Sequence, residues 1–182
     1  MLTIQTSIEY FTMSQLYPTQ PPADPTSGPG SFTTRFRSKG ITVLMADDDD
    51  DDCMLAKEAW KELNTPNHLR FVRDGEELME YLQHRGAYSD PKESPPPGLI
   101  LLDLNMPKKN GYEALREIKT DPYLRKIPVI VFTTSTNEED ISQVYDLGAN
   151  SFVGKPSNYD GYVTLLGTLN TFWLQLVKLP HL

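Results

Sequence analysis

Three short apolar runs constrain the fold of this 182-residue chain more than any other feature. They cover residues 41–46, 99–102 and 127–132, and each ends abruptly in polar residues. Runs of this length, bounded by polar residues, are typical of buried strands. Strands that are apolar on both sides indicate a parallel sheet with helices over both faces. The chain is therefore expected to be an α/β protein.

Helical patterns separate these runs. We expect helices over residues 52–63, 74–82, 110–120, 137–147 and 157–178, and two further short strands over 68–72 and 151–153. Asp74, with Glu77 three residues later, predicts a capping box, and Asn137 can cap the fourth helix. Five strands that alternate with five helices predict a doubly wound five-stranded parallel sheet.

The first 39 residues differ from the rest in composition. They are rich in Pro, Ser and Thr, which bury too little apolar surface to offset the entropy of ordering. We therefore expect residues 1–39 to be a disordered N-terminal tail and residues 40–180 to form one domain. Scattered apolar residues within 2–16 leave open a short docking element.

Charge, hydropathy and cysteine content exclude several classes of protein. The net charge is −8, of which the first forty residues contribute +1, so the body is acidic and lacks the basic surface that nucleic acids need. No apolar stretch is long enough to span a membrane, and the N-terminus lacks a standard secretion signal. One cysteine, Cys53, rules out an internal disulfide and suits a reducing, cytoplasmic compartment.

Polar residues follow the strands where ligands bind in such sheets, beyond the carboxyl ends. The four strands concerned are followed by carboxylates, a hydroxyl and an ammonium: Asp47 and Asp48, Asp103, Thr133, and Lys155. Carboxylates can hold a divalent cation, while a lysine and a hydroxyl can contact phosphoryl oxygens. A central carboxylate such as Asp103 can form an acyl phosphate. The set predicts phosphoryl-transfer chemistry.

Six consecutive aspartates, 47–52, follow the first strand. We expect Asp47 and Asp48 to be metal-site residues, the next two to be loop residues, and the last two to begin a helix whose dipole favours them. A shift of this assignment by one residue stays open, as does a purely solvated charge run. An EF-hand loop beginning at Asp47 is disfavoured, because Asp52 takes the position that requires glycine.

Four stretches, 45–48, 101–111, 131–135 and 148–156, resemble the receiver domain of two-component response regulators, a (βα)5 flavodoxin-like fold. The resemblance covers about residues 41–178. It implies that Asp103 is the phosphoacceptor, Thr133 the switch hydroxyl and Lys155 the phosphoryl contact. It also implies Mg²⁺ (or Mn²⁺) held by Asp48, by Asp47 through water, by Asp103 and by the main-chain carbonyl of Asn105.

Two positions qualify the resemblance. Phe152 stands where the family often has tyrosine, so this switch aromatic can change rotamer by packing alone. Pro156 resembles the family's cis-proline after the lysine. The Pro-rich loop over 85–98 and the chain ending over 171–180 are similar to single-domain regulators paired with phytochrome-type sensor kinases.

The resemblance implies a phosphoacceptor and not an enzyme: a sensor histidine kinase donates the phosphoryl group and the output runs through protein contacts. A phosphorylation-independent binding module is an alternative. A hydrolase of the haloacid dehalogenase type is another, but it expects aspartate where this chain has Asn105. The apolar stripe of the last helix leaves open a homodimer or partner contact through residues 172–179, or an ordinary core helix.

Overall fold

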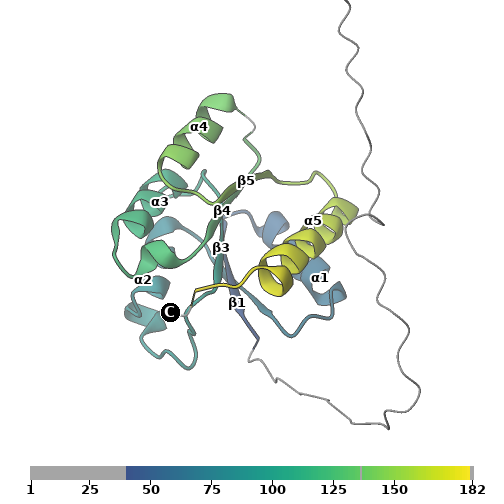
Figure 1. The fold of residues 1–182 in the computed structure, drawn as a ribbon, viewed down its shortest axis with the longest axis horizontal. Coiled ribbons are helices and arrows are strands. Elements are labelled where there is room, and N and C mark those ends of the chain that lie inside the picture. The colour runs from purple at the N-terminus through teal and green to yellow at the C-terminus, as the bar shows by residue number, and fades with distance from the viewer. Residues whose placement is uncertain (1–39, 136, 181–182) are drawn as a thin grey trace, which may run out of the picture. The chain divides into compact units, whose positions relative to one another are not determined.

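The computed structural model describes residues 40–135 and 137–180 (Figure 1). The predictions for residues 1–39, both the tail and the docking element within 2–16, lie outside these ranges. No helix in the described part of the chain combines the length and hydropathy needed to cross a bilayer.

A single sheet of five parallel strands forms the centre of the domain (Figure 1). The strand order is β2-β1-β3-β4-β5, which confirms the predicted doubly wound sheet. The strands are β1 (Thr42–Ala46), β2 (His68–Val72), β3 (Leu99–Leu102), β4 (Val129–Thr133) and β5 (Ser151–Gly154).

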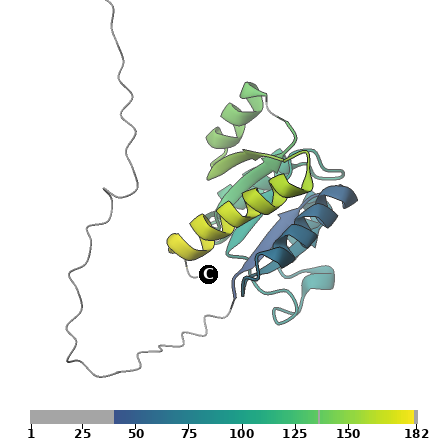
Figure 2. The ribbon, with the colours of Figure 1, turned by 90° about the vertical axis from the view of Figure 1, so that its right-hand side faces the viewer.

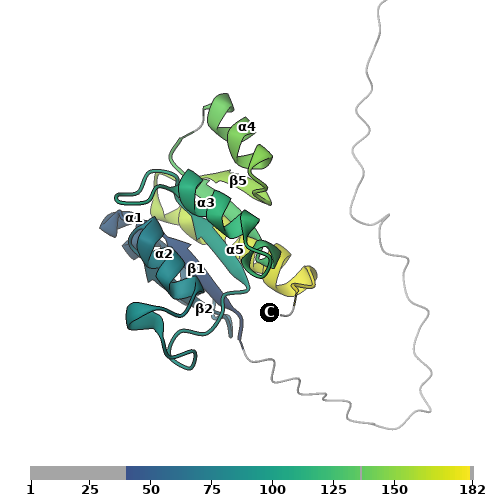
Figure 3. The same cartoon turned by 90° about the vertical axis from the view of Figure 1, so that its left-hand side faces the viewer.

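Five α-helices cover the sheet, with α2, α3 and α4 on one face and α1 and α5 on the other (Figures 2 and 3). They are α1 (Asp50–Glu62), α2 (Gly75–Leu82), α3 (Gly111–Thr120), α4 (Glu138–Asp146) and α5 (Tyr159–Thr171). Short 3₁₀ turns lie at Gly86–Tyr88 and Leu124–Lys126, and one π-helical turn, Phe172–Leu176, follows α5.

Alternation along the buried strands builds two separate apolar cores. On β1, Leu44 and Ala46 pack toward α2 and α3, while Val43 and Met45 pack toward α1 and α5. All four are at most 1% exposed. Fully burying one such large side chain stabilises the fold by about 1.5–3 kcal/mol. The apolar runs of the sequence do not alternate with polar residues because each central strand packs one face against each of the two cores.

Two helix boundaries differ from those predicted. Helix α1 begins at Asp50, so the expected loop position of this residue is wrong. The reason is the cap: the Asp49 side chain accepts hydrogen bonds from the amides of Asp51 and Asp52. The last helix was predicted to reach residue 178, but the backbone is already extended at Val177.

The predicted cap of α2 is present in a modified form. Asp74 accepts from the Glu77 amide at 2.8 Å, as expected. The Glu77 carboxylate, however, accepts from the amide of Arg73, one residue before the cap. The prediction that Asn137 caps α4 is confirmed by its side chain, which accepts from the Glu139 amide.

The crossover direction reverses between β1 and β3, and this brings two aspartates together. Ala46 and Leu102, the last residues of these strands, pair in register. The Asp103 amide donates to the Ala46 carbonyl at 3.0 Å, and the Asp47 amide donates to the Val72 carbonyl at 3.0 Å. Asp47 and Asp103 therefore leave the sheet side by side, where open α/β sheets bind their ligands.

Candidate functional site

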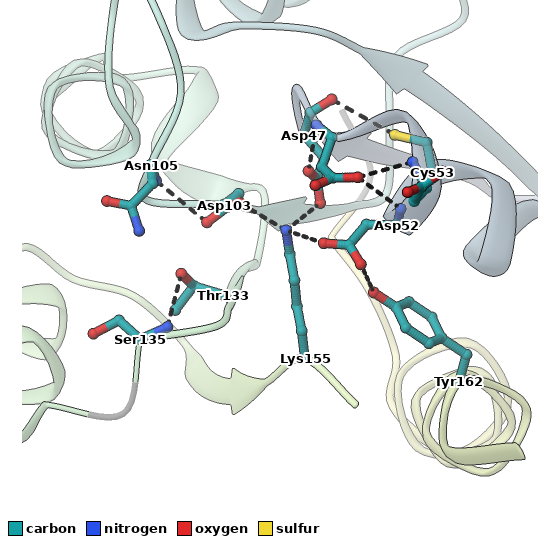
Figure 4. A network of polar contacts seen from close by, with 11 residues as sticks. Asp47, Asp52, Cys53, Asp103, Asn105, Thr133, Ser135, Lys155 and Tyr162 are labelled. Carbon is teal, nitrogen blue, oxygen red and sulfur yellow. Dashed lines mark hydrogen bonds and ion pairs between the residues drawn. The ribbon is translucent and has the colours of Figure 1, made fainter. Parts of the chain in front are cut away.

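The structure brings the predicted polar residues to one rim at the carboxyl ends of the strands (Figure 4). Thr133 is the last residue of β4, and its carbonyl accepts from the Lys155 amide at 2.8 Å. This bond carries Lys155 directly after β5 and toward the aspartates. Asp47 and Thr133 are fully buried, and Asp103 is nearly so.

The Lys155 ammonium lies at the centre of the site (Figure 4). Its Nζ is 2.7 Å from Asp103 Oδ2, 2.7 Å from Asp47 Oδ2 and 2.8 Å from Asp52 Oδ2. The contacts with Asp103 and Asp52 are hydrogen bonds, whereas the contact with Asp47 is an ion pair without hydrogen-bond geometry. Only 2% of the lysine side chain is exposed. One buried cation therefore faces three carboxylates.

Burial and charge act in opposite directions on these groups. Burial raises the pKa of Asp47 to about 6, against the lowering effect of Lys155, and the neighbouring Asp103 carboxylate adds to the rise. Burial alone lowers a lysine pKa, but the carboxylates of Asp103, Asp47 and Asp52 outweigh it and raise that of Lys155. The site thus holds a permanently charged ammonium and an excess of negative charge.

The excess carboxylates fit a divalent cation. Asp47, Asp48 and Asp103 each offer an oxygen, and these oxygens lie within 4.8 Å of one another. Asp47 Oδ2 is buried and makes no hydrogen bond beside its ion pair with Lys155, while Asp48 is exposed and leaves the group open to solvent. Oxygen ligands alone suit Mg²⁺ or Mn²⁺. These three residues would hold the cation, and the predicted fourth ligand, Asn105, adjoins Asp103 through its amide, 3.2 Å from Oδ1.

The loop after β3 is held in place by the starts of two helices. The Gly111 amide donates to the Leu104 carbonyl at 2.9 Å, and the Gly75 amide donates to the Lys109 carbonyl at 3.0 Å. A Cβ atom at Gly111 would lie 2.1 Å from the Asp103 carbonyl oxygen, and one at Gly75 would lie 2.3 Å from that of Lys109. Glycine at both positions lets the helices approach the loop that carries Asp103.

The two predicted switch residues occupy different environments. Thr133 Oγ1 accepts from the Ser135 amide at 3.4 Å at the rim. Phe152 is partly buried, pairs with Val131 in the sheet and packs against the core under α2, α3 and α4. Their roles stay predictions.

The expectation of a cis peptide bond before Pro156, drawn from the resemblance to the family, is wrong. All peptide bonds of the described residues are trans, including that between Lys155 and Pro156. The lysine reaches its carboxylates without a cis bond, because the hydrogen bond to the Thr133 carbonyl fixes its backbone. The trans form is also the intrinsically preferred one.

Sequence reasoning missed two residues of the site. Asp52 was expected only at the start of a helix whose dipole favours it, yet it binds Lys155. Tyr162 was assigned no role in the site. The Tyr162 hydroxyl donates to Asp52 Oδ1 at 2.7 Å. One signal was available: Asp52, Ala56 and Ala59 follow a helical period, and both alanines are buried. Asp52 therefore lies on the face of α1 that points into the protein.

Comparisons with known proteins agree with this geometry. Residues 43–166 match the family model described as the response regulator receiver domain. The chain is 41% identical over 138 residues to response regulator Rcp1 of Synechocystis, covering 76% of this chain and 92% of that protein.

Solved structures include similar proteins. The phosphorylated cyanobacterial phytochrome response regulator RcpA is 40% identical, with a TM-score of 0.73, over 78% of this chain and 99% of that one. The Mn²⁺-bound form of Rcp1 is also 40% identical, with a TM-score of 0.70 and the same coverage. The three carboxylates of Asp47, Asp48 and Asp103, called the acidic trio below, and this likeness support binding of a divalent metal. The chain belongs to the response regulator receiver domain family.

Proposed function

We propose that Asp103 accepts a phosphoryl group from a phosphohistidine of a sensor kinase. A carboxylate oxygen of Asp103 forms a bond to phosphorus as the P–N bond of phosphohistidine breaks, and the electron pair of that bond leaves on the imidazole nitrogen. A divalent cation bound by Asp47, Asp48 and Asp103 would neutralise charge on the phosphoryl oxygens. The product is an acyl phosphate on this chain.

One observation carries the proposal: the Lys155 ammonium lies 2.7 Å from Asp103 Oδ2, beside an acidic trio that includes Asp103. A cation fixed against the acceptor can pair with a transferred phosphoryl oxygen without a costly rearrangement.

Phosphorylation biases two states of the domain under this proposal. The Thr133 hydroxyl turns toward the phosphoryl group, and Phe152 repacks against the core at α4. Phe152 lacks a hydroxyl, so its two states differ by packing and not by a hydrogen bond to Thr133.

The partner that we propose is a phytochrome-type sensor histidine kinase in the cytoplasm. Support comes from RcpA, which is named a phytochrome response regulator and is 40% identical to this chain. The domain extends over 40–180, with 1–39 as a tail. Asp103 is a phosphoacceptor and not the nucleophile of a turnover enzyme, because Asn105 stands where a haloacid dehalogenase needs a second aspartate.

Output passes through protein contacts, and we place one of them at the end of α5. Phe172 and Leu176 are 50% and 72% exposed and border an open groove of about 580 Å³ on this helix. A second copy of the chain is the proposed occupant. Leu176→Asp is expected to lower the dimer fraction in sedimentation velocity, and an unchanged fraction would contradict this contact.

The decisive experiment labels Asp103. Wild-type protein incubated with a phosphorylated histidine kinase and Mg²⁺ should gain one phosphate that alkali or hydroxylamine removes, seen by intact-mass spectrometry. Asp103→Asn should gain none, and the exposed-residue control Asp146→Asn should behave as wild type. Equal labelling of Asp103→Asn, or no labelling of wild type by any kinase of the source organism or by a small phosphodonor, would overturn the proposal.

A further inference from the structure

Asp52 is a third carboxylate on Lys155, and it comes from a different element than the other two. It lies in the first turn of α1, while Asp47 and Asp103 follow strands. Its Oδ2 accepts from the Lys155 ammonium at 2.8 Å, and 80% of its side chain is shielded from solvent. The acidic trio found among the described residues does not include it.

The second oxygen of Asp52 is fixed by α5. Oδ1 accepts from the Tyr162 hydroxyl at 2.7 Å (Figure 4). Tyr162 is fully buried, and its ring meets the ring of Phe132 edge to face, with centroids 5.8 Å apart. Phe132 directly precedes Thr133 on β4. A rigid aromatic pair in the core therefore sets the position of the Asp52 carboxylate.

The other two partners of Lys155 take on new roles during phosphoryl transfer. Under the proposed function, on which this inference rests, Asp103 becomes an acyl phosphate and Asp47 gives its oxygen to the cation. Both changes weaken the bonds that hold the ammonium in the resting protein. Asp52 has neither role, so its bond to Lys155 can persist from the resting state to the phosphorylated one.

We propose that Asp52 is the positioning residue of this site, with Tyr162 fixing it. Asp52 holds the Lys155 ammonium beside Asp103 while the phosphoryl group is transferred, so that the ammonium meets the phosphoryl oxygens at a set distance. Asp52 touches neither the phosphoryl group nor the divalent metal ion and acts through Lys155 alone. Small displacements of such a group are costly, since transfer depends on geometry.

The test uses a small phosphodonor, acetyl phosphate, with Mg²⁺ and full-length protein, so that kinase contacts do not enter. The rate of labelling of Asp103 is measured against donor concentration. Asp52→Asn and Tyr162→Phe should each lower the maximal rate by on the order of tenfold. The double variant should lose no more than Asp52→Asn alone, because Tyr162 acts only through Asp52.

Two matched controls separate position from charge and from packing. Asp51→Asn removes the same charge from an exposed neighbour, and Tyr159→Phe removes a hydroxyl from the same helix. Both should keep the wild-type rate. Calorimetric titration with Mg²⁺ should give Tyr162→Phe a Kd within about twofold of wild type, since the charge and the trio are intact.

A merely structural pair would give another pattern. Thermal stability would fall in Asp52→Asn and Tyr162→Phe, while the maximal rate of the folded protein stayed at the wild-type value; that result overturns the inference. Full additivity of the two losses overturns it as well. Should Asp52→Asn fail to fold, Tyr162→Phe alone decides. Wild-type labelling in the same experiment keeps this failure distinct from a failure of Asp103 as acceptor.

Discussion

Two neighbouring strand-to-helix junctions each contain a buried aspartate, Asp47 in the first and Asp74 in the second, and the surroundings of the two carboxylates differ. In the second junction, residues 73–77, both oxygens of Asp74 have donors: the Glu77 amide at 2.8 Å and the Lys108 ammonium at 2.6 Å. In the first, residues 47–52, the buried Asp47 accepts from the Asp49 amide at 3.1 Å, and its other oxygen lies 2.7 Å from the Lys155 ammonium, which Asp52 and Asp103 share. Asp74 thus has an ammonium that no other carboxylate shares in this junction, whereas three carboxylates share the ammonium of Lys155 and leave an excess of negative charge.

The pKa values follow this difference. Burial tends to raise the pKa of Asp74, but its bonds to Lys108 and to the Glu77 amide lower it below the ordinary value. Burial likewise raises that of Asp47, and there it prevails, giving about 6. The two carboxyl groups have the same kinds of partner, so the higher pKa of Asp47 follows from its deeper burial and from the neighbouring Asp103 carboxylate.

The largest effect is expected from removal of the Lys155 ammonium, which Asp47, Asp52 and Asp103 share. Lys155→Met leaves three carboxylates facing one another and should lower the free energy of unfolding by roughly 3–5 kcal/mol in EDTA at pH 8. Urea unfolding measures this. Mg²⁺ should restore part of the loss, and more than it adds to wild type, because it supplies positive charge to the folded state. Equal stability of variant and wild type in EDTA would show that the ammonium is not needed to balance the negative charge of the three carboxylates.

A smaller effect is expected in the second junction. Asp74→Ala removes the cap of α2 and should cost about 1–2 kcal/mol, measured in the same way. The stabilisation by Mg²⁺ should equal that of wild type, since Asp74 is outside the acidic trio. A loss of the Mg²⁺ response in this variant would mean that the two junctions are not separate.

The charge of Asp74 can be separated from its cap. Asp74→Asn keeps an accepting oxygen and removes the charge. Because the folded-state pKa of Asp74 is lowered from 3.8, the advantage of wild type should be complete above that value and vanish as the pH falls through the lower folded pKa. Unfolding curves between neutral and acidic pH test this. An advantage that grows on acidification would contradict the sign.

The smallest effect is expected where the two junctions meet. Arg73 Nη2 lies 2.6 Å from Asp50 Oδ1, but the side chains are 47% and 88% exposed. Arg73→Ala should therefore change stability by at most about 0.5 kcal/mol, and salt should remove the difference. A larger, salt-resistant change would show that the junctions support each other.

The sequence was sufficient for the sheet and for the residues at strand ends. Strand ends can be located from apolar runs, and parallel strands bring their carboxyl ends together whatever the loops do. For this reason Asp47, Asp103, Thr133 and Lys155 were predicted on one rim from four separate stretches.

Asp52 and Tyr162 could not be predicted in the same way. Asp52 meets Lys155, which lies 103 residues away just after β5. It meets Tyr162, which lies 110 residues away, through the packing of α1 against α5. Helix rotation and distance decide such contacts, and a periodic pattern fixes neither closely. The end of α5 at Thr171 was missed for a similar reason, since apolar residues continue beyond the helix.

The glycines at the starts of α2 and α3 have a consequence for sequence variation. Neither performs any chemistry, yet every side chain at Gly111 would collide with the main chain of Asp103, and every one at Gly75 with that of Lys109. A single methyl group at either position must displace the loop that carries Asp103. Two residues without a functional group therefore constrain the position of Asp103 through the side chains that they lack.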